Sequence, residues 1–426
     1  MANSFDSNFT AKLAKGFLSA FEAERVLSKN VNTQKLDGKF DPSTGTTTYF
    51  KRPTDYVTVR TSTGDVHSET ASSIITGKAV GTVQNYFTAF VDYNEADEAL
   101  KMDEIDELLR PMATRMKNDL EVDFAAFMMK NCGLLAGTPG YYVNTWEEVA
   151  NAGAVLQSTG VPMDSPWYFA VNPYTQRKLA ATQRSLGAGG SVGGMISDAH
   201  KKAIITQNFA GFDSVLTATT LASYTTSADR AGAVGAAPPV TYVAAKDTMT
   251  MALPVTGFTS GQVIKAGEVV QITGRYRLNL ATRQRILDDT GASVLFTGVV
   301  TTDSAAIAGD GTGTITITGP AVYESGGQYN TTVAAVAEND VVTLLGSAST
   351  TYQPNLFWHK DAFAIGSVPI KKLYSTDTLA TTKDGLQFRV SKGADFLYNL
   401  NKVRIDFRPA YAVLNPFFAG HCYGTE

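Results

Sequence analysis

The sequence predicts an α+β protein whose body is interrupted by an inserted all-β domain. Between residues 95 and 222, helical periodicity alternates with short buried strands, which is typical of α+β domains. Between residues 223 and 350, short strands follow one another without a helix, and stretches rich in Ala, Gly, Thr and Ser border them on both sides. After Pro354 the mixed pattern returns, so the β domain lies inside the body.

The composition narrows the class of protein. At ~150 residues per domain, 426 residues make two or three structural units. Charged residues are only 18%, below the usual ~25%, which suits a surface that meets neighbouring proteins, although a Thr-rich β domain has the same composition. The net charge of -4, from 36 basic and 40 acidic residues, argues against a dedicated nucleic-acid binder.

Cysteine usage and hydropathy indicate the compartment. Cys132 and Cys422 are far apart and match neither a metal-site spacing nor a disulfide framework, so a reducing compartment fits best. The N-terminus lacks the apolar core and small-residue cleavage site of a signal peptide. No apolar run approaches ~18 residues, so no transmembrane helix is expected.

Residues 1–45 are expected to form an N-terminal arm. Phe9, Leu13, Phe17 and Phe21 recur every four residues and predict an amphipathic helix over residues 8–27. Such a stripe packs either on the helix's own domain or on a neighbouring subunit, and the sequence leaves both possibilities open.

Residues 46–92 are predicted to form a long, polar β-hairpin that acts as an extended loop. β-Branched and aromatic runs alternate with turn residues, at Thr46–Phe50, Tyr56–Arg60, Ile74–Ile75 and Val83–Val91. The segment holds few core-forming residues for its length, and a hairpin that buries little of itself is marginal alone. We therefore expect it to lie on another surface, with a fold back onto its own domain as the alternative.

The charged residues of this hairpin are the candidate intersubunit contacts. They are Lys51, Arg52 and Arg60 on one arm, with Asp65 and Glu69 near the tip. Opposite charges on an adjacent subunit would fix the register of the hairpin while contributing modestly to affinity.

Residues 93–140 carry the strongest helical signal, within 95–131. Apolar residues recur there at steps of three and four, from Ile105 to Met128. Acidic residues load the start, which suits the helix macrodipole. Pro111 is expected to mark either the first position of a second helix or a kink, and Gly133 follows as a stop signal.

The remaining segments complete the α+β pattern. Residues 141–222 predict helices at Trp146–Gln157 and Pro173–Arg184 and strands at Trp167–Val171 and Phe212–Leu216. In residues 223–350 the expected strands are Val240–Ala245, Thr248–Leu253, Val269–Thr273, Arg275–Leu280, Ser293–Val300, Gly313–Thr318 and Val341–Leu345. Residues 222–239 and 346–351 are expected to be linkers, and residues 351–426 return to the body.

A search for catalytic or metal-binding patterns finds none that is convincing. Gly189–Gly193 matches the serine-hydrolase pattern around Ser191, but no buried strand leads into it, so we expect a flexible loop and no nucleophile. The histidines His67, His200, His359 and His421 are scattered and form no metal-ligand pair. Asp303 and Asp310 do not complete a calcium loop. We expect no enzyme activity, metal or cofactor.

Several stretches resemble the coat-protein family of short-tailed enteric phages, of the P-22 and Sf-6 kind. Their shared order and spacing span nearly the whole chain, and the closer resemblance is to the Sf-6 kind. The stretches are Phe50–Pro53, Gly77–Gly81 with Asn85 and Tyr86, Ala210–Leu216, Ile264–Glu268, Pro354–Trp358, Gly366–Pro369, Pro409–Tyr411 and Asn415 with Pro416.

This resemblance implies the HK-97 capsid fold: an N-terminal arm on 1–45, an extended loop on 46–92, a peripheral domain with its spine helix on 93–140, the first part of an axial domain on 141–222, an inserted β-barrel domain on 223–350, and a return to the axial and peripheral domains on 351–426. It also implies a major capsid protein of a tailed bacteriophage, which assembles with itself into the hexamers and pentamers of an icosahedral procapsid and mature shell.

The partners implied by the resemblance are a scaffolding protein, a portal and enclosed double-stranded DNA that is bound without sequence specificity, with no membrane. The implied location is the virion capsid, assembled in the host bacterial cytoplasm. Lys78 lies in the extended loop, yet this family is not known for lysine–asparagine cross-links, so none is expected. The rival functions are another phage structural protein, such as a tail-tube or decoration subunit, and a carbohydrate-binding or carbohydrate-active protein.

Overall fold

The structure is a computed structural model of the 426-residue chain. It describes residues 5–33, 47–51, 56, 58–69, 71–94, 105–186, 202, 203, 205, 207–238, 240–368, 370–374, 377–395, 398 and 400–425. The chain forms two compact units, each built from separated segments. The first holds residues 1–48, 81–125 and 363–412, and the second holds residues 49–80, 126–362 and 413–426.

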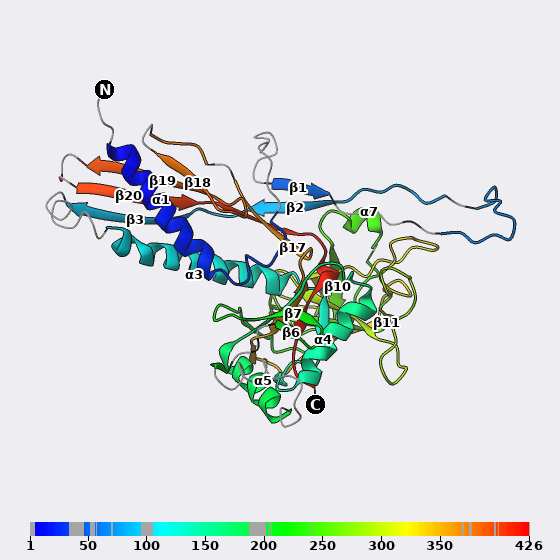
Figure 1. Cartoon of the computed structure of the whole chain (residues 1–426). Helices are drawn as coiled ribbons and strands as arrows, with labels where there is room; N and C mark the ends of the chain where they lie inside the picture. The colour runs from blue at the N-terminus through cyan, green and yellow to red at the C-terminus, as the bar shows by residue number, and fades with distance from the viewer. Residues whose placement is uncertain are drawn as a thin grey trace. The chain divides into compact units, whose positions relative to one another are not determined.

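The first unit contains an antiparallel four-stranded sheet covered by the N-terminal helix. The strand order is β18 (Thr378–Thr381), β19 (Gln387–Asp395), β20 (Leu400–Phe407) and β3 (Phe87–Asn94). Helix α1 (Phe5–Glu24) lies across β18 and β19 (Figure 1). Its buried Phe17 and Phe21 meet Phe388 and Phe407 edge to face, with ring centroids 4.8–6.1 Å apart. The predicted apolar stripe of the arm thus packs on its own subunit.

Helix α3 (Ile105–Lys130) is the long helix that the sequence predicts. Its buried stripe has the spacing of a helix face and runs through Met116, Leu120, Phe124 and Met128. Pro111 lies inside the helix, so the expectation that it starts a second helix is wrong. In the first unit, Phe124 packs edge to face on Tyr411, and the Tyr411 hydroxyl donates to Asp123 at 2.9 Å.

A second sheet has the strand order β1 (Thr47–Lys51), β2 (Lys78–Val83), β21 (Pro409–Val413) and β17 (Phe363–Ser367). Strands β2 and β21 pair antiparallel from Gly81 to Val83. Between β1 and β2 the chain makes its long excursion. Figure 1 shows it as a blue trace that runs out past the ends of both strands.

The second unit contains a mixed six-stranded sheet. Its order is β4 (Leu134–Ala136), β22 (Ala419–Cys422), β16 (Asn355–His359), β5 (Trp167–Val171), β7 (Phe212–Thr217) and β6 (Gln207–Phe209). Strand β16 is buried at every position, which explains its continuous apolar run. Helix α4 (Trp146–Thr159) starts with a capping box between Thr145 and Glu148, and α5 (Pro173–Leu186) follows β5. The short helix η3 (Pro416–Phe418) precedes β22.

The inserted segment of this unit forms a closed antiparallel barrel. Its order is β10 (Thr250–Thr256), β13 (Gly313–Thr318), β12 (Leu295–Val300), β11 (Val269–Tyr276), β14 (Val341–Leu344) and β9 (Ala231–Val234), which pairs back with β10. Closure removes free strand edges. A cluster of buried apolar side chains fills the interior, among them Leu253, Ile272, Phe296 and Ile315. The predicted α+β class with a long helix and an inserted β barrel is confirmed.

The structure departs from four local predictions. Val240–Ala245 is not a strand, because Thr241 caps the short helix α7 (Tyr242–Ala245). Residues 222–239 are not all linker, since β9 completes the barrel there. Strands β1 and β2 pair at the base of the predicted hairpin. Farther out, the described residues 58–60 and 71–77 form no strand, so that part of the hairpin is an open loop. The expected strand at Val83–Val91 is split, and β3 pairs with β20 instead of with the excursion. No helix in the described segments is long and apolar enough to cross a membrane.

Candidate functional site

The outer part of the extended loop, residues 56–77, belongs to the second unit and exposes four large apolar side chains. Its large apolar side chains are exposed by 54% at Tyr56, 41% at Val59, 60% at Val66 and 76% at Ile74. Several exposed large apolar side chains on one short segment make it a candidate contact surface.

The predicted contact residues fall partly on this loop. Arg60, Asp65 and Glu69 are all exposed there, and none makes an ion pair with another residue in the described parts of the chain. The Asp65 carboxylate instead accepts the backbone N–H of His67 at 2.9 Å, which shapes the turn. Lys51 is the last residue of β1, and Arg52 lies outside the described residues.

A second exposed apolar feature lies in the first unit, between β3 and α3. It is a groove of about 640 Å³ that opens to solvent. Its lining includes Phe90, exposed by 70%, and Tyr86, exposed by 49%. An exposed ion pair between Arg115 and Asp119, with a 3.1 Å distance between Nε and Oδ2, lies beside these rings.

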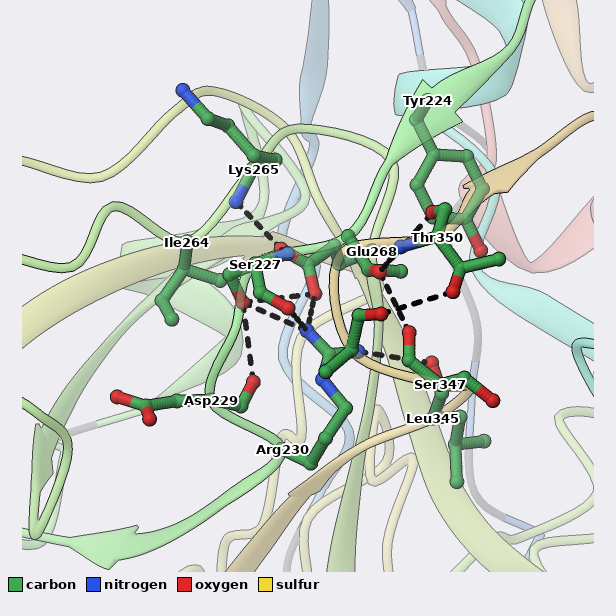
Figure 2. A network of polar contacts seen from close by, with 12 residues as sticks. Tyr224, Ser227, Asp229, Arg230, Ile264, Lys265, Glu268, Leu345, Ser347 and Thr350 are labelled. Carbon is green, nitrogen blue, oxygen red and sulfur yellow. Dashed lines mark hydrogen bonds and ion pairs between the residues drawn. The ribbon is translucent and has the colours of Figure 1, made fainter.

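A buried network of charged and polar groups lies at the root of the barrel, the place where the chain enters and leaves the inserted domain (Figure 2). Glu268 is fully buried and forms an ion pair with Arg230. Its carboxylate also accepts the Ser227 N–H at 2.9 Å, the Ser227 hydroxyl at 3.2 Å and the Lys265 N–H at 2.8 Å. The network therefore satisfies a carboxylate that burial alone would destabilise.

The same network closes the two connections of the barrel onto each other. Strand β8 (Tyr224–Thr225) pairs with β15 (Thr351–Tyr352) just outside the barrel. The Thr226 hydroxyl donates to the Ser347 carbonyl at 2.7 Å and accepts the Thr350 N–H at 2.9 Å. The two segments that were expected to be loose linkers thus form an ordered neck.

A buried arginine joins the barrel to the neighbouring sheet of the same unit. The Arg277 Nη2 atom donates to the Gly133 carbonyl at 3.0 Å and to the Thr297 carbonyl at 2.7 Å. Its guanidinium also lies 5.8 Å from the ring centroids of Phe296 and Phe417. Burial lowers the pKa of Arg277 to about 10, so the group stays charged at neutral pH.

Sequence reasoning missed this network and this arginine. Both depend on which positions of separated strands become buried together, and a single sequence does not show that. The only available signal was the isolated charge of Glu268 directly before the apolar pair Val269 and Val270.

The residues considered for catalysis or metal binding do not come together where they are described. His67 is exposed on the loop, whereas His359 and His421 are buried in separate contacts. Within the described residues, no group of three or more His, Cys, Asp or Glu side chains could hold a metal ion. Ser191 and His200 lie outside the described residues.

A family model and a sequence relative point to the same family of proteins. The family model described as "P22 coat protein - gene protein 5" matches residues 1–423. The major capsid protein of Acyrthosiphon pisum secondary endosymbiont phage 1 is 32% identical over 428 residues, covering 100% of both chains. Among solved structures, one from Mycobacterium phage Che8 covers 93% of this chain and 90% of its own, with a TM-score of 0.45 and 10% identity. The capsid of cyanophage P-SCSP1u covers 90% and 84%, with a TM-score of 0.39 and 10% identity.

Proposed function

Because the chain belongs to the P22 coat protein family and is a major capsid protein of a phage, we propose that it builds its shell by laying the extended loop on a neighbouring copy. The chain has the HK-97-type fold expected of this family, with its long helix, extended loop and inserted barrel. The rival assignments, a tail-tube or decoration subunit and a carbohydrate-binding protein, are not favoured by the family match.

One observation carries the proposal: the loop exposes both apolar and charged side chains. Ile74 and Val66 are more than half exposed, and Arg60 and Asp65 make no ion pair in the described parts of the chain. Burying such apolar side chains releases roughly 25 cal/mol per Å² of apolar surface. In a shell, where copies of the chain lie next to one another, a neighbouring copy can cover these side chains.

The receiving surface in this proposal is the groove between β3 and α3 of the neighbour. The groove offers the exposed rings of Phe90 and Tyr86 to the apolar residues of the loop. Arg115 and Asp119 place one positive and one negative charge beside these rings. The loop likewise carries one charge of each sign, on Arg60 and Asp65. This match favours a second copy of the chain over an unrelated ligand.

Charge reversal on the loop tests the proposal. In the double variant Arg60→Glu with Asp65→Lys, the monomer should keep its folding stability, because both side chains are exposed and the lost bond from the His67 N–H to Asp65 lies in an exposed turn. Shell assembly should become slower or require more protein, and the size of the defect should change with ionic strength. Normal assembly together with a less stable monomer would place the loop in its own subunit's fold.

An introduced disulfide tests the receiving groove. The native Cys132 and Cys422 are both buried, so background cross-linking is low. The variant with Ile74→Cys and Phe90→Cys should give covalent multimers in oxidised shells and none in unassembled monomer. As a matched control, Ile74→Cys paired with Val122→Cys places the second thiol on an exposed position of α3 outside the groove lining. Equal cross-linking in both variants would contradict the groove assignment.

The wider role rests on the family resemblance. We propose that copies of the chain form hexamers and pentamers of an icosahedral procapsid, with a scaffolding protein and a portal, in the host bacterial cytoplasm. The shell then encloses double-stranded DNA without reading its sequence, which fits a net charge of -4. Co-assembly of purified chain and scaffolding protein, followed by electron microscopy, tests this role through the appearance of closed shells.

We propose further that the chain is purely structural and has no catalytic activity. Ser191 is the residue that tests this, since it lies in the one hydrolase-like pattern. Ser191→Ala should assemble like the unchanged chain, and a fluorophosphonate probe should not label the protein. Specific labelling of Ser191 would contradict the proposal.

A further inference from the structure

The returning stem of the extended loop, residues 71–78, is fastened to the inserted barrel domain of its own chain. Both segments belong to the second compact unit. Three backbone groups of the stem are bonded by side chains from the barrel domain. Gln328 Nε2 donates to the Ser73 carbonyl at 2.8 Å, the Tyr329 hydroxyl donates to the Ile75 carbonyl at 3.3 Å, and the Asp247 carboxylate accepts the Lys78 N–H at 2.9 Å.

An apolar contact reinforces these three bonds. The rings of Tyr242 and Tyr329 are stacked, with centroids 3.7 Å apart and planes 9° apart. Ile75 packs against the cluster that these rings form with Val322. The side chain of its neighbour Ile74 is 76% exposed. Adjacent side chains of the stem thus differ sharply in exposure, as expected when an extended chain lies on a surface.

The spacing of the bonds explains why stem residues 73–77 keep one conformation before strand β2 begins at Lys78. In an extended chain, side chains and carbonyls two residues apart point the same way. Ser73 and Ile75 therefore present both carbonyls to the barrel domain, where side-chain donors replace the partner strand. Farther out, the loop contains short-range bonds, for example from the His67 N–H to Asp65.

We infer that the inserted barrel domain is a positioning element for the extended loop, in which Gln328, Tyr329 and Asp247 fix the stem so that the loop leaves the subunit in one direction. The inference rests on the proposed docking of the loop on a neighbour. Fixing the stem beforehand lowers the conformational entropy that is lost when the loop docks, and preorganisation of this kind increases affinity without new contacts.

A triple variant of the full chain tests the inference. Gln328→Ala and Tyr329→Phe remove the two donors but keep the stacked ring, and Asp247→Ala removes the acceptor of the Lys78 N–H. The matched control is Gln262→Ala, Tyr323→Phe and Glu338→Ala, at positions of the barrel domain whose side chains form no hydrogen bond or ion pair with the stem in the described residues. Both triple variants should keep the cooperative unfolding of the barrel.

Two measurements decide the outcome. In the monomer, hydrogen exchange of the amides of residues 74–78 should rise by about tenfold or more in the test variant and stay unchanged in the control. Shell assembly by the test variant should be slower, and its shells should be less uniform. Unchanged exchange in the stem would overturn the inference, and so would faster exchange combined with normal assembly.

The loop-tip variant separates this inference from the proposed function. Arg60→Glu with Asp65→Lys should impair assembly while stem exchange stays normal. If that variant assembles normally, the proposed docking of the loop tip on a neighbour is wrong. The hydrogen-exchange result would still decide separately whether the barrel domain fixes the stem.

Discussion

The Nε2 atom of His421, on β22, lies 2.8 Å from the carbonyl oxygen of Met129, near the end of α3. The imidazole is fully buried, and its Nδ1 atom has no hydrogen-bond partner among the described residues. The ring of Tyr224 lies nearly parallel to it, with the two ring centroids 6.3 Å apart. Burial lowers the pKa of His421 to about 4, and the bond to Met129 opposes this shift only partly.

Because the pKa of His421 is lowered in the folded chain, we expect the free energy of unfolding to depend on pH. The unfolded chain takes up the proton near pH 6.5, whereas the folded chain takes it up only near pH 4. The contribution of neutral His421 is therefore complete above about pH 6.5 and falls as the pH drops toward 4, by roughly 3 kcal/mol in total.

Denaturant unfolding at several pH values checks this expectation. His421→Gln keeps an N–H donor for Met129 but cannot titrate, so the stability difference between the unchanged chain and the variant should shrink between pH 6.5 and 4. Other acid-sensitive groups, such as His359, are present in both proteins and cancel. A difference that is constant with pH would show that His421 is not buried in the neutral form.

Glu121 is predicted to anchor the segment that follows α1. Its buried carboxylate accepts the Leu27 N–H at 2.7 Å, the Ser28 N–H at 3.1 Å and the Ser28 hydroxyl. Glu121→Ala leaves these donors without their acceptor, so the free energy of unfolding should fall by about 2–4 kcal/mol.

Asp119→Ala is the control, because Asp119 lies on the same helix in an exposed ion pair with Arg115. Its effect should stay within about 0.5 kcal/mol. Equal losses in the two variants would show that helix propensity, and not the anchor, causes the change.

The network at the barrel root makes Glu268 the most sensitive charged position of the inserted domain. Residues 223–350 expressed alone should fold and give dispersed amide signals in NMR spectra. In that fragment, Glu268→Ala should lower the free energy of unfolding by about 3–5 kcal/mol, because it strands a partly buried Arg230. Lys265→Ala breaks only the exposed pair with Asp303 and should cost less than about 1 kcal/mol. A random-coil spectrum of the unchanged fragment would contradict its autonomy.

We expect mature shells to be held together without covalent links between subunits. Cys132 and Cys422 are buried, and burial raises the pKa of both thiols, which disfavours the reactive thiolate. Boiled shells should therefore run as one band near 45.5 kDa, with or without reductant. A ladder of multimers that persists under reduction would reveal another cross-link, with Lys78 as the first residue to substitute.

The sequence predicted the elements whose pattern comes from local burial. Strand β5 has the predicted bounds, Trp167–Val171, because a short apolar run between turn residues is typical of a buried strand. The long helix was equally clear, since its apolar stripe is continuous over several turns. The division of the chain into six domain segments stays a prediction.

The errors arose where a distant residue decides the local structure. Strand β9 has the sequence Ala-Gly-Ala-Val, which is typical of a linker. Its Gly232 is required because a Cβ atom there would lie 2.3 Å from the ring of Phe258. Likewise, Ile74 and Ile75 have strand-forming side chains, yet barrel side chains hold that stem in place of a partner strand. Neither relationship is visible in one sequence.

The pairing of β8 with β15 places the entrance and the exit of the barrel side by side, with Tyr224 opposite Tyr352. A segment of more than a hundred residues can therefore be excised or exchanged at this one point without re-routing the rest of the chain. The neck is thus a natural junction for grafting a foreign domain onto a shell-forming scaffold. A graft that lacks Gln328 and Tyr329 would leave the body connected but its extended loop without a fixed stem.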